Sequence, residues 1–264
     1  MSRNTSRTPL RVVSLAPNVT SILLALGAGR ELVGVSKWCK EVAPVGRRPQ
    51  VGDCWKMDLD EVMRLKPTIL IGSVPFATQT VDGILKEPVA FLALNPRTLA
   101  DIYGDVRMLA RLVNRPDCGE DLVRKMQHAF SQVANRARRI RTGPRVYCEA
   151  WPNPRIGSPP WVRELVEIAG GRMVVAPGAR VADVEVARAK PDVIVLAWAA
   201  TGDRAKPEAA LRNPAWKNVP AIKAGRVVVI RDEILNTPGP PLIQGVRALF
   251  HAIHPPAETR LKTK

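Results

Sequence analysis

The fold is indicated most directly by Pro17-Asn18-Val19-Thr20-Ser21-Ile22, which leads through a glycine-containing turn to Leu32-Val33-Gly34-Val35. A similar pair of stretches occurs later, as Pro160-Trp161-Val162-Arg163-Glu164-Leu165 and Met173-Val174-Val175. In each copy a proline begins a helical pattern, and the second stretch is short, apolar and typical of a buried strand. The chain therefore contains two related α/β halves.

A second motif is shared by the two halves. It reads Leu65-Lys66-Pro67-Thr68-Ile69-Leu70-Ile71 in the first and Ala189-Lys190-Pro191-Asp192-Val193-Ile194-Val195-Leu196 in the second. Both indicate the end of a helix, a proline that prevents its continuation, and a buried strand. We therefore expect two Rossmann-like α/β lobes with parallel sheets. Two lobes imply a cleft between them, where ligand pockets are common.

Helical periodicity without a strand pattern covers residues 98–143, interrupted only at Arg115-Pro116. A helix of this length is a stiff connector, so we expect it to bridge the lobes and to limit their closure. The predicted organisation is an N-terminal lobe at residues 1–97, this linking helical segment, a C-terminal lobe at 144–254 and a polar tail at 255–264.

The net charge is strongly positive, at +16 for 264 residues. Such a charge attracts nucleic acid or anionic lipid, and the densest basic run lies between Arg136 and Arg145. Since no recognition motif accompanies this run, we expect solvated surface charge and no specific nucleic-acid binding. Nucleic-acid binding through the run would instead predict a steep salt dependence.

Neither a membrane span nor a secretory signal is predicted. No apolar run approaches the ~20 residues that a span needs. The stretch from Met1 to Leu10 is polar and basic, and no apolar segment follows it. A cytoplasmic location therefore stays open.

Four of the six tryptophans are predicted at strand ends, on the edge of the sheet where parallel α/β folds bind ligands. They are Trp38, Trp55, Trp151 and Trp198. In a chain with only 5% aromatic residues, this predicts an aromatic-walled cleft for a large, flat, partly apolar ligand. The alternative is that these loop tryptophans pack back on the lobes, since tryptophan is highly buried on average.

No catalytic motif accompanies these tryptophans. The sequence lacks a nucleophile elbow, a phosphate-binding loop and a dinucleotide fingerprint. Asp53, Glu149 and Glu233 lie near predicted strand ends and are candidates for acid/base groups, but no histidine or second carboxylate is paired with them. We expect buried polar contacts to a ligand and no enzymatic activity.

The cysteines and histidines do not indicate a metal site, because no CxxC pair and no His-x-x-x-His spacing occurs. Cys39, Cys54 and Cys148 lie near the predicted sheet edge. A soft-metal thiolate site and a Cys39–Cys54 disulfide are the alternatives to small buried side chains, the usual role of cysteine. We expect no metal and no covalently bound cofactor.

Together these features resemble the substrate-binding proteins of cobalamin and iron–siderophore ABC importers, over residues 11–253. The most specific stretches are Arg11-Val12-Val13-Ser14-Leu15-Ala16-Pro17, Leu26-Gly27-Ala28-Gly29, Gln50-Val51-Gly52, Met57-Asp58-Leu59-Asp60 and Leu65-Lys66-Pro67. The resemblance implies a periplasmic-binding-protein-like fold of the helical-backbone class, with two lobes joined by a long helix. The cobalamin branch is the closer likeness, because of the aromatic residues after the second strand and in the second lobe.

The resemblance also implies which positions contact the ligand. Trp38 matches an aromatic contact, whereas Cys54 occupies a second position that is usually aromatic, and Trp55 follows it. The full set of expected contacts is Trp38, Cys54, Trp55, Trp151, Trp198 and Glu233.

Permease docking in the resembled family uses one acidic residue on each lobe. Asp60 occupies the first-lobe position and keeps the charge of the usual glutamate. In the second lobe the equivalent position is Val184, so its neighbour Glu185 is the candidate. Ser21 is a further departure, because a glutamate usually follows the residue equivalent to Thr20.

The sequence thus predicts a monomeric substrate-binding protein that captures a corrinoid, cobalamin, for delivery to an ABC permease and its ATPase. The resemblance implies an extracytoplasmic location. An iron–siderophore or haem receptor of the same fold is the alternative in this class, and a siderophore anion would favour Arg155, Lys37 and Lys56. A small α/β enzyme using a cleft carboxylate is the alternative from another class.

Overall fold

The computed structural model describes residues 9–140 and 142–256. The chain forms two compact units. Unit 1 comprises the chain up to Asn95 together with Gly104–Leu122, and unit 2 comprises Pro96–Tyr103 together with the chain from Val123 onward. Residues outside the described ranges include most of the polar stretch from Met1 to Leu10 and most of the predicted tail at 255–264. Arg141 of the basic run also lies outside them.

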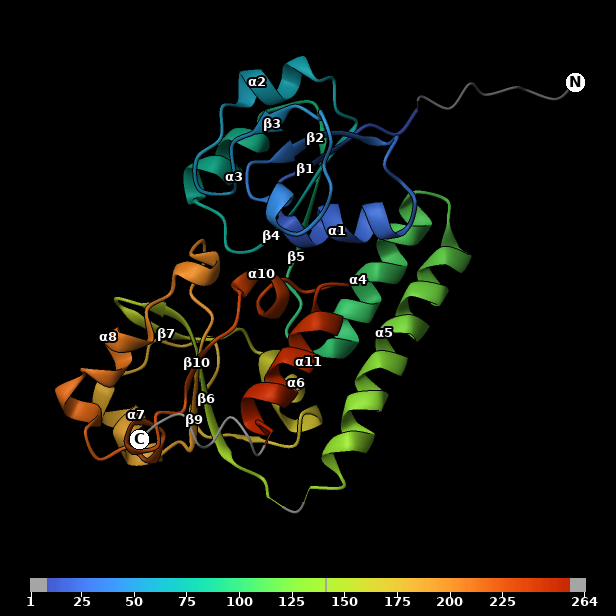
Figure 1. The fold of residues 1–264 in the computed structure, drawn as a ribbon. Coiled ribbons are helices and arrows are strands. Elements are labelled where there is room, and N and C mark those ends of the chain that lie inside the picture. The colour runs from blue at the N-terminus through green and yellow to red at the C-terminus, as the bar shows by residue number, and fades with distance from the viewer. Residues whose placement is uncertain (1–8, 141, 257–264) are drawn as a thin grey trace, which may run out of the picture. The chain divides into compact units, whose positions relative to one another are not determined.

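Unit 1 contains a sheet of five parallel strands (Figure 1). The strand order is β3-β2-β1-β4-β5, so the first strand lies in the middle and the order reverses beside it. The strands are β1 (Val12–Ser14), β2 (Leu32–Ser36), β3 (Gln50–Val51), β4 (Ile69–Ser73) and β5 (Ala90–Leu94). Val13 and Leu15 pack with Val62 and Ile84 in a buried cluster on one face of this sheet.

Three helices follow strands of unit 1: α1 (Pro17–Ala25), α2 (Leu59–Arg64) and α3 (Thr78–Ile84). Asparagine is a common N-cap residue, but Asn18 does not cap α1. Ala16 is the N-cap and Pro17 is the first helical residue, because its fixed φ suits that position. Asn18 therefore lies inside the helix, where its amide donates to Ser73 Oγ at 3.0 Å. Asp58 does cap α2, since its carboxylate accepts from the Glu61 N–H at 3.2 Å.

Two consecutive helices make up the strand-free middle of the chain, α4 (Leu99–Leu112) and α5 (Pro116–Ala137). Asn114 turns the chain between them with a φ of 56°. Each helix contributes residues to both units, because the divisions at Tyr103 and Leu122 fall inside them.

Unit 2 also contains a five-stranded sheet, in which β10, β9 and β6 are parallel and β8 and β7 both pair with β6. Its strands are β6 (Arg145–Pro152), β7 (Arg155–Gly157), β8 (Arg172–Met173), β9 (Val193–Leu196) and β10 (Val227–Val229). The short strand β7 runs antiparallel to β6, which the sequence did not predict. With that local exception, the predicted class of two α/β units with parallel sheets is confirmed.

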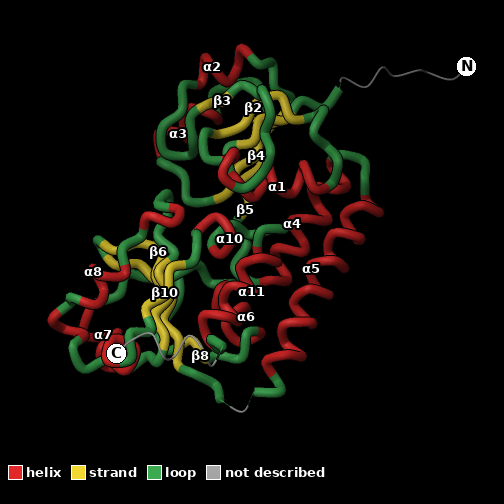
Figure 2. The backbone as a smooth tube through the Cα atoms, in the orientation of Figure 1, coloured by secondary structure: helices red, strands yellow, loops and turns green. Residues whose placement is uncertain are grey.

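Helices cover both faces of the second sheet (Figure 2). On one face, Val146 and Cys148 pack against α6 (Val162–Ile168) and α11 (Leu242–Ile253). On the other, Tyr147 packs among residues of α7 (Asp183–Ala189), α8 (Pro207–Leu211) and α9 (Pro220–Lys223). This alternation follows from the two-residue period of a strand. A short helix, α10 (Asp232–Leu235), precedes α11.

The internal repeat of the sequence corresponds to a repeated topology. β1 lies between β2 and β4, and β6 lies between β8 and β9. The shared Lys-Pro phrase also has the same backbone in both copies, because Lys66 and Lys190 have φ values of 49° and 48°.

Candidate functional site

In unit 1 the chain leaves β2 at Ser36, and Trp38 follows at the carboxyl edge of the sheet, as predicted. The Trp38 ring is 39% exposed. Its indole Nε1 donates to Asp53 Oδ2 at 2.9 Å. Lys37 Nζ lies 3.1 Å from the same carboxylate oxygen and 5.1 Å from the centre of the Trp38 ring. The indole is therefore held at its N–H and has a cation close to its ring.

Asp53 is saturated with hydrogen-bond donors. Its second oxygen, Oδ1, accepts the backbone N–H groups of Trp55 and Lys56, both at 3.0 Å. Burial alone would raise the pKa of Asp53, but the hydrogen bonds from Trp38, the backbone and Lys37 outweigh it and lower the pKa below its ordinary value. Asp53 is therefore an ionised structural acceptor, and its fully committed oxygens do not suit it to proton transfer.

Trp55 and Cys54 differ sharply in exposure although they are neighbours. Trp55 is 63% exposed, whereas Cys54 is buried and its thiol lies 3.3 Å from the Leu15 carbonyl oxygen. Burial raises the pKa of Cys54 to about 11. All four cysteines are free thiols, so the Cys39–Cys54 disulfide considered from the sequence is not formed. Cys39 instead contacts the hydroxyls of Thr20 and Ser36.

In unit 2 the corresponding acceptor is Glu149, which is fully buried in β6 at the point where the pairing with β9 ends. Oε1 accepts the indole N–H of Trp198 at 2.9 Å, and Oε2 accepts the Tyr147 hydroxyl at 2.8 Å. Oε2 also accepts from the guanidinium of Arg155. Burial, followed by the charge of Glu149, raises the pKa of Tyr147. Glu149 thus joins an aromatic side chain of the sheet edge to the core of the unit.

Arg155 completes this arrangement from β7. Its Nε donates to Asp183 Oδ1 at 2.8 Å, and its guanidinium lies 4.3 Å from the centre of the Trp216 ring. The chain after β9 is bound to β6 as well, because the N–H groups of Ala197 and Ala199 donate to backbone oxygens of Glu149 and Ala150. Trp198 therefore lies beside Glu149.

Trp151 lies in a hairpin strand, which corrects the expectation of a loop. β6 continues to Pro152, and after Asn153 and Pro154 the chain returns as β7. The antiparallel pairing with β7 extends β6 past the point where its parallel neighbour β9 ends. The Trp151 ring is 41% exposed, and its Nε1 donates to the Asn153 carbonyl oxygen at 2.9 Å.

Glu233 lies on α10, just after β10, and is nearly buried. Arg231 Nε lies 3.3 Å from its Oε2. The neighbouring Asp232 has an Oδ1 atom that is buried without a hydrogen-bond partner among the described residues. Burial, and then the negative charge of Glu233, raises the pKa of Asp232 to about 7. Asp232 is a titratable group that the sequence did not indicate.

The two acidic residues predicted to dock a permease are exposed on short helices. Asp60 lies in the first turn of α2. Glu185 lies in the first turn of α7, and its carboxylate accepts the Ala182 N–H at 2.7 Å. Val184, between Asp183 and Glu185, is 56% exposed.

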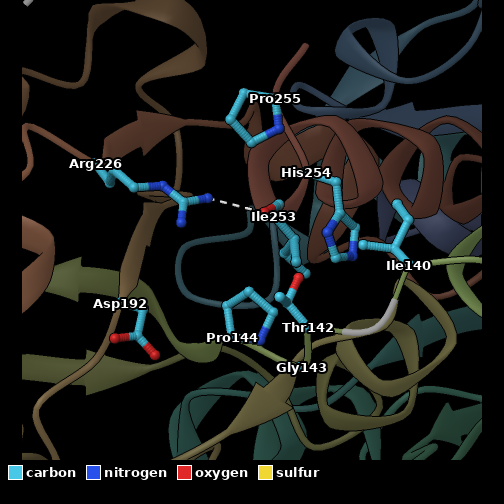
Figure 3. A pocket seen from close by; sticks show the side chains of 9 residues that line it. All are labelled: Ile140, Thr142, Gly143, Pro144, Asp192, Arg226, Ile253, His254 and Pro255. Atoms are coloured by element: carbon cyan, nitrogen blue, oxygen red, sulfur yellow. Dashed lines mark hydrogen bonds between the residues drawn. The ribbon is translucent and has the colours of Figure 1, made fainter. Parts of the chain in front are cut away.

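A cavity of about 680 Å³ lies at the opposite edge of the second sheet, where the parallel strands begin (Figure 3). Pro144, Asp192 and Arg226 line it from just before β6, β9 and β10. Arg226 donates to the Ile253 carbonyl oxygen at 2.8 Å. This edge carries none of the tryptophans predicted to bind ligand.

The sequence predicted Asp53 and Glu149 near strand ends but did not predict their partners. Trp38 and Asp53 are separated by 15 residues, and Glu149 and Trp198 by 49. Such pairs have no local sequence signature. Within the described ranges no helix is long and apolar enough to cross a membrane.

Comparison with known proteins agrees with the fold. The chain is 26% identical to YvrC, an uncharacterized ABC transporter substrate-binding lipoprotein of Bacillus subtilis, over 94% of this chain and 81% of that protein. It is 24% identical to the vitamin B12-binding protein of Pectobacterium atrosepticum over 71% of each. A periplasmic heme binding protein from Pseudomonas aeruginosa has the same fold, with a TM-score of 0.80, 23% identity and coverage of 94% of each chain.

A protein-family model also matches most of the sequence. The model is that of the periplasmic binding proteins, and it matches residues 12–234, from the first strand of unit 1 to α10 of unit 2. The match therefore includes the Trp38–Asp53 pair of unit 1 and the Trp198–Glu149 pair of unit 2. This chain belongs to the periplasmic binding protein family, whose members serve as substrate-binding proteins of ABC transporters.

Proposed function

We propose that this protein binds a corrinoid, held by Trp38 and Trp55 of unit 1 and by Trp151 and Trp198 of unit 2. The observation that carries the proposal is the placement of partly exposed indoles at the carboxyl ends of strands in both units. Indole faces suit a large, flat, partly apolar molecule. The vitamin B12-binding relative supports the same ligand class.

Haem is a weaker candidate because of the chemistry of its iron. Proteins hold haem iron through histidine, tyrosine, cysteine or methionine. Both tyrosines of the chain belong to unit 2, where Tyr103 packs on the hydrophobic core and Tyr147 is buried against Glu149. The histidines lie on or beside α5 and α11, and the Cys54 thiol is buried. Cobalamin carries its own lower axial ligand and needs none of these side chains.

An iron–siderophore anion is also less well supported. Two of the three cations expected to favour it are paired with carboxylates, Lys37 with Asp53 and Arg155 with Glu149 and Asp183. Lys56 is exposed. A binding role also fits Asp53 and Glu149 better than acid/base catalysis does, since donors occupy both oxygens of each carboxylate.

We further propose that the loaded protein docks on an ABC permease through Asp60 and Glu185, and that it acts outside the cytoplasm as the family does. Both carboxylates are exposed and lie in the first turns of α2 and α7. Replacing both by lysine is expected to abolish delivery to the permease and to leave ligand affinity unchanged.

The decisive experiment is a titration of the protein with cyanocobalamin, ferric siderophore and haem, followed by calorimetry and tryptophan fluorescence. Saturable one-to-one binding of cyanocobalamin is expected. Trp38→Ala and Trp151→Ala should weaken it at least tenfold, the loss of about one well-packed aromatic contact. Leu85→Ala is the matched control, because Leu85 is an exposed apolar side chain elsewhere on unit 1. Tight binding of haem or siderophore with no response to cyanocobalamin would replace the corrinoid.

A further inference from the structure

One arrangement occurs in both units although the residues that form it are unrelated in sequence position. A buried carboxylate accepts the indole N–H of a tryptophan at the carboxyl edge of the sheet, at 2.9 Å in each case. The pairs are Asp53 with Trp38 and Glu149 with Trp198. We propose that Asp53 and Glu149 are positioning residues that fix these two rings before the ligand arrives. This inference rests on the proposed function.

In unit 1 the carboxylate is itself immobilised. Asp53 Oδ1 is held by the backbone N–H groups of Trp55 and Lys56, so that Oδ2 is directed at the Trp38 indole. Lys37 lies near one face of the Trp38 ring while pairing with the same oxygen. With its N–H bound and one face next to a cation, the Trp38 ring offers its opposite face to a ligand.

In unit 2 the immobilisation is tighter, because Glu149 is fully buried in a strand. Tyr147 and Arg155 hold Oε2, which leaves Oε1 for Trp198. The backbone around Trp198 is also fixed, since the Thr201 hydroxyl donates to the Trp198 carbonyl oxygen at 2.7 Å. The two rings therefore have their orientations set by the fold.

The bound indole N–H groups restrict which part of a ligand Trp38 and Trp198 can recognise. An indole N–H that is bound to a carboxylate is not available to the amide oxygens of a corrinoid. Trp38 and Trp198 thus contact the flat, apolar part of the ligand through their ring faces. Fixing a side chain in advance also removes the entropy cost of ordering it on binding, which corresponds to about three- to tenfold in affinity per ring.

The test is a double-mutant cycle on Asp53 and Trp38, with cyanocobalamin as the probe. Asp53→Asn keeps an oxygen for the backbone N–H groups but sets an amide NH₂ against the indole N–H. We expect this variant to bind about three- to tenfold more weakly. Trp38→Phe keeps a ring but has no N–H to orient, so in its background Asp53→Asn should have no further effect. Equal losses in both backgrounds would overturn the inference.

A spectroscopic readout separates positioning from general support of the fold. The indole N–H of Trp38, identified by its loss in Trp38→Phe, should shift upfield in the nitrogen–proton spectrum of unliganded Asp53→Asn while the other indole signals stay in place. An unchanged Trp38 signal would contradict the role of Asp53. Asp192→Asn is the matched control. It breaks the ion pair with Arg145 at the edge where the parallel strands of the second sheet begin, and it should leave the affinity for cyanocobalamin unchanged.

The same cycle applies to Glu149→Gln and Trp198→Phe, with thermal unfolding to show that the variants remain folded at the temperature of the titration. Failure of the wild-type protein to bind cyanocobalamin, haem or siderophore would overturn the proposed function and the inference together. Binding by the wild-type protein with additive losses in both cycles would overturn the inference alone.

Discussion

Arg155 contacts three side chains of unit 2, although it directly follows the turn of a hairpin. It pairs with Glu149 and Asp183 and lies over the Trp216 ring. Because Glu149 is fully buried, removing its cationic partner leaves a buried charge with only neutral donors. Arg155 therefore holds together the face of the second sheet that carries Trp198.

We expect Arg155→Ala to lower the free energy of unfolding by about 3 kcal/mol, the usual cost of breaking a buried ion pair by removing one partner. Arg155→Lys should recover little of it, since lysine has no planar fork for two carboxylates and a ring. Urea unfolding gives the comparison. The control is Arg107→Ala, because the side chain of its partner Glu120 is 44% exposed, and the loss there should be much smaller.

Asp232 makes stability depend on pH. Its pKa is raised to about 7 by burial and by Glu233, whereas in the unfolded chain it is about 3.9. Between these values the folded protein keeps a proton that the unfolded chain releases. The contribution of Asp232 to stability is therefore present at low pH and is lost as pH rises toward 7. Asp232→Asn should be more stable than the wild type at about pH 8 and close to it at about pH 4.5, in urea unfolding at both values. An equal difference at both would contradict the assignment.

At this scale the sequence predicted positions better than partners. Trp38 and Trp198 are at the ends of strands, as their neighbours in the sequence indicated. The hydrogen bonds that hold them depend on how β2 lies beside β3 in unit 1 and how β6 lies beside β9 in unit 2, and this is set by tertiary packing. For the same reason Asp53 and Glu149 could be identified as candidates while their role could not.

Among the elements, the two Lys-Pro connections are the clearest product of the internal repeat. Lys66 and Lys190 both have a left-handed backbone directly before a proline and a buried strand. For a residue with a Cβ atom this conformation costs about 1 kcal/mol, a cost that glycine does not have.

Lys66→Gly and Lys190→Gly should therefore each raise the free energy of unfolding, by about 0.5–1 kcal/mol. Thermal or urea unfolding of the two variants measures this. Lys125→Gly is the matched control, because Lys125 is exposed in the middle of α5. There the same substitution should destabilise the protein by about 1 kcal/mol. Loss of stability in all three variants would contradict the argument.

Prediction from sequence succeeded for strongly patterned elements and missed several short ones. α7 ends at Ala189 and β9 spans Val193–Leu196, as the second Lys-Pro motif indicated. β3, β7 and α10 were missed, since two to four residues carry too little periodicity to indicate an element. Asn18 does not cap α1, because Pro17 already begins the helix.

The two units of the molecule are not separated at the ends of the helical middle segment. The chain passes between the two units three times, after Asn95, Tyr103 and Leu122. Val106, Leu109 and Ala110 of α4 are buried and belong to unit 1. Arg115 also pairs with Glu31 of unit 1 at 2.9 Å. The second half of α4 and the start of α5 therefore complete the core of the first unit.

A fragment ending at Asn95 should consequently remain unfolded or molten, whereas one ending at Leu122 should gain cooperative structure. Circular dichroism and the dispersion of amide signals distinguish the two. As a matched control, the longer fragment with Leu109→Asp should behave like the shorter one, because a charge would replace a fully buried side chain. A cooperatively folded 1–95 fragment would show that the helical segment is dispensable.

This interleaving has a consequence for biosynthesis. The first sheet is complete once β5 has been translated, but unit 1 still lacks its α4 and α5 segments until Leu122 has left the ribosome. Pro96–Tyr103, translated before that point, belongs to the other unit and packs with α6 and α11. The apolar side chains of those residues stay uncovered until α11 has been synthesised, more than a hundred residues later. Chaperone binding during translation is therefore expected to concentrate on the beginning of α4.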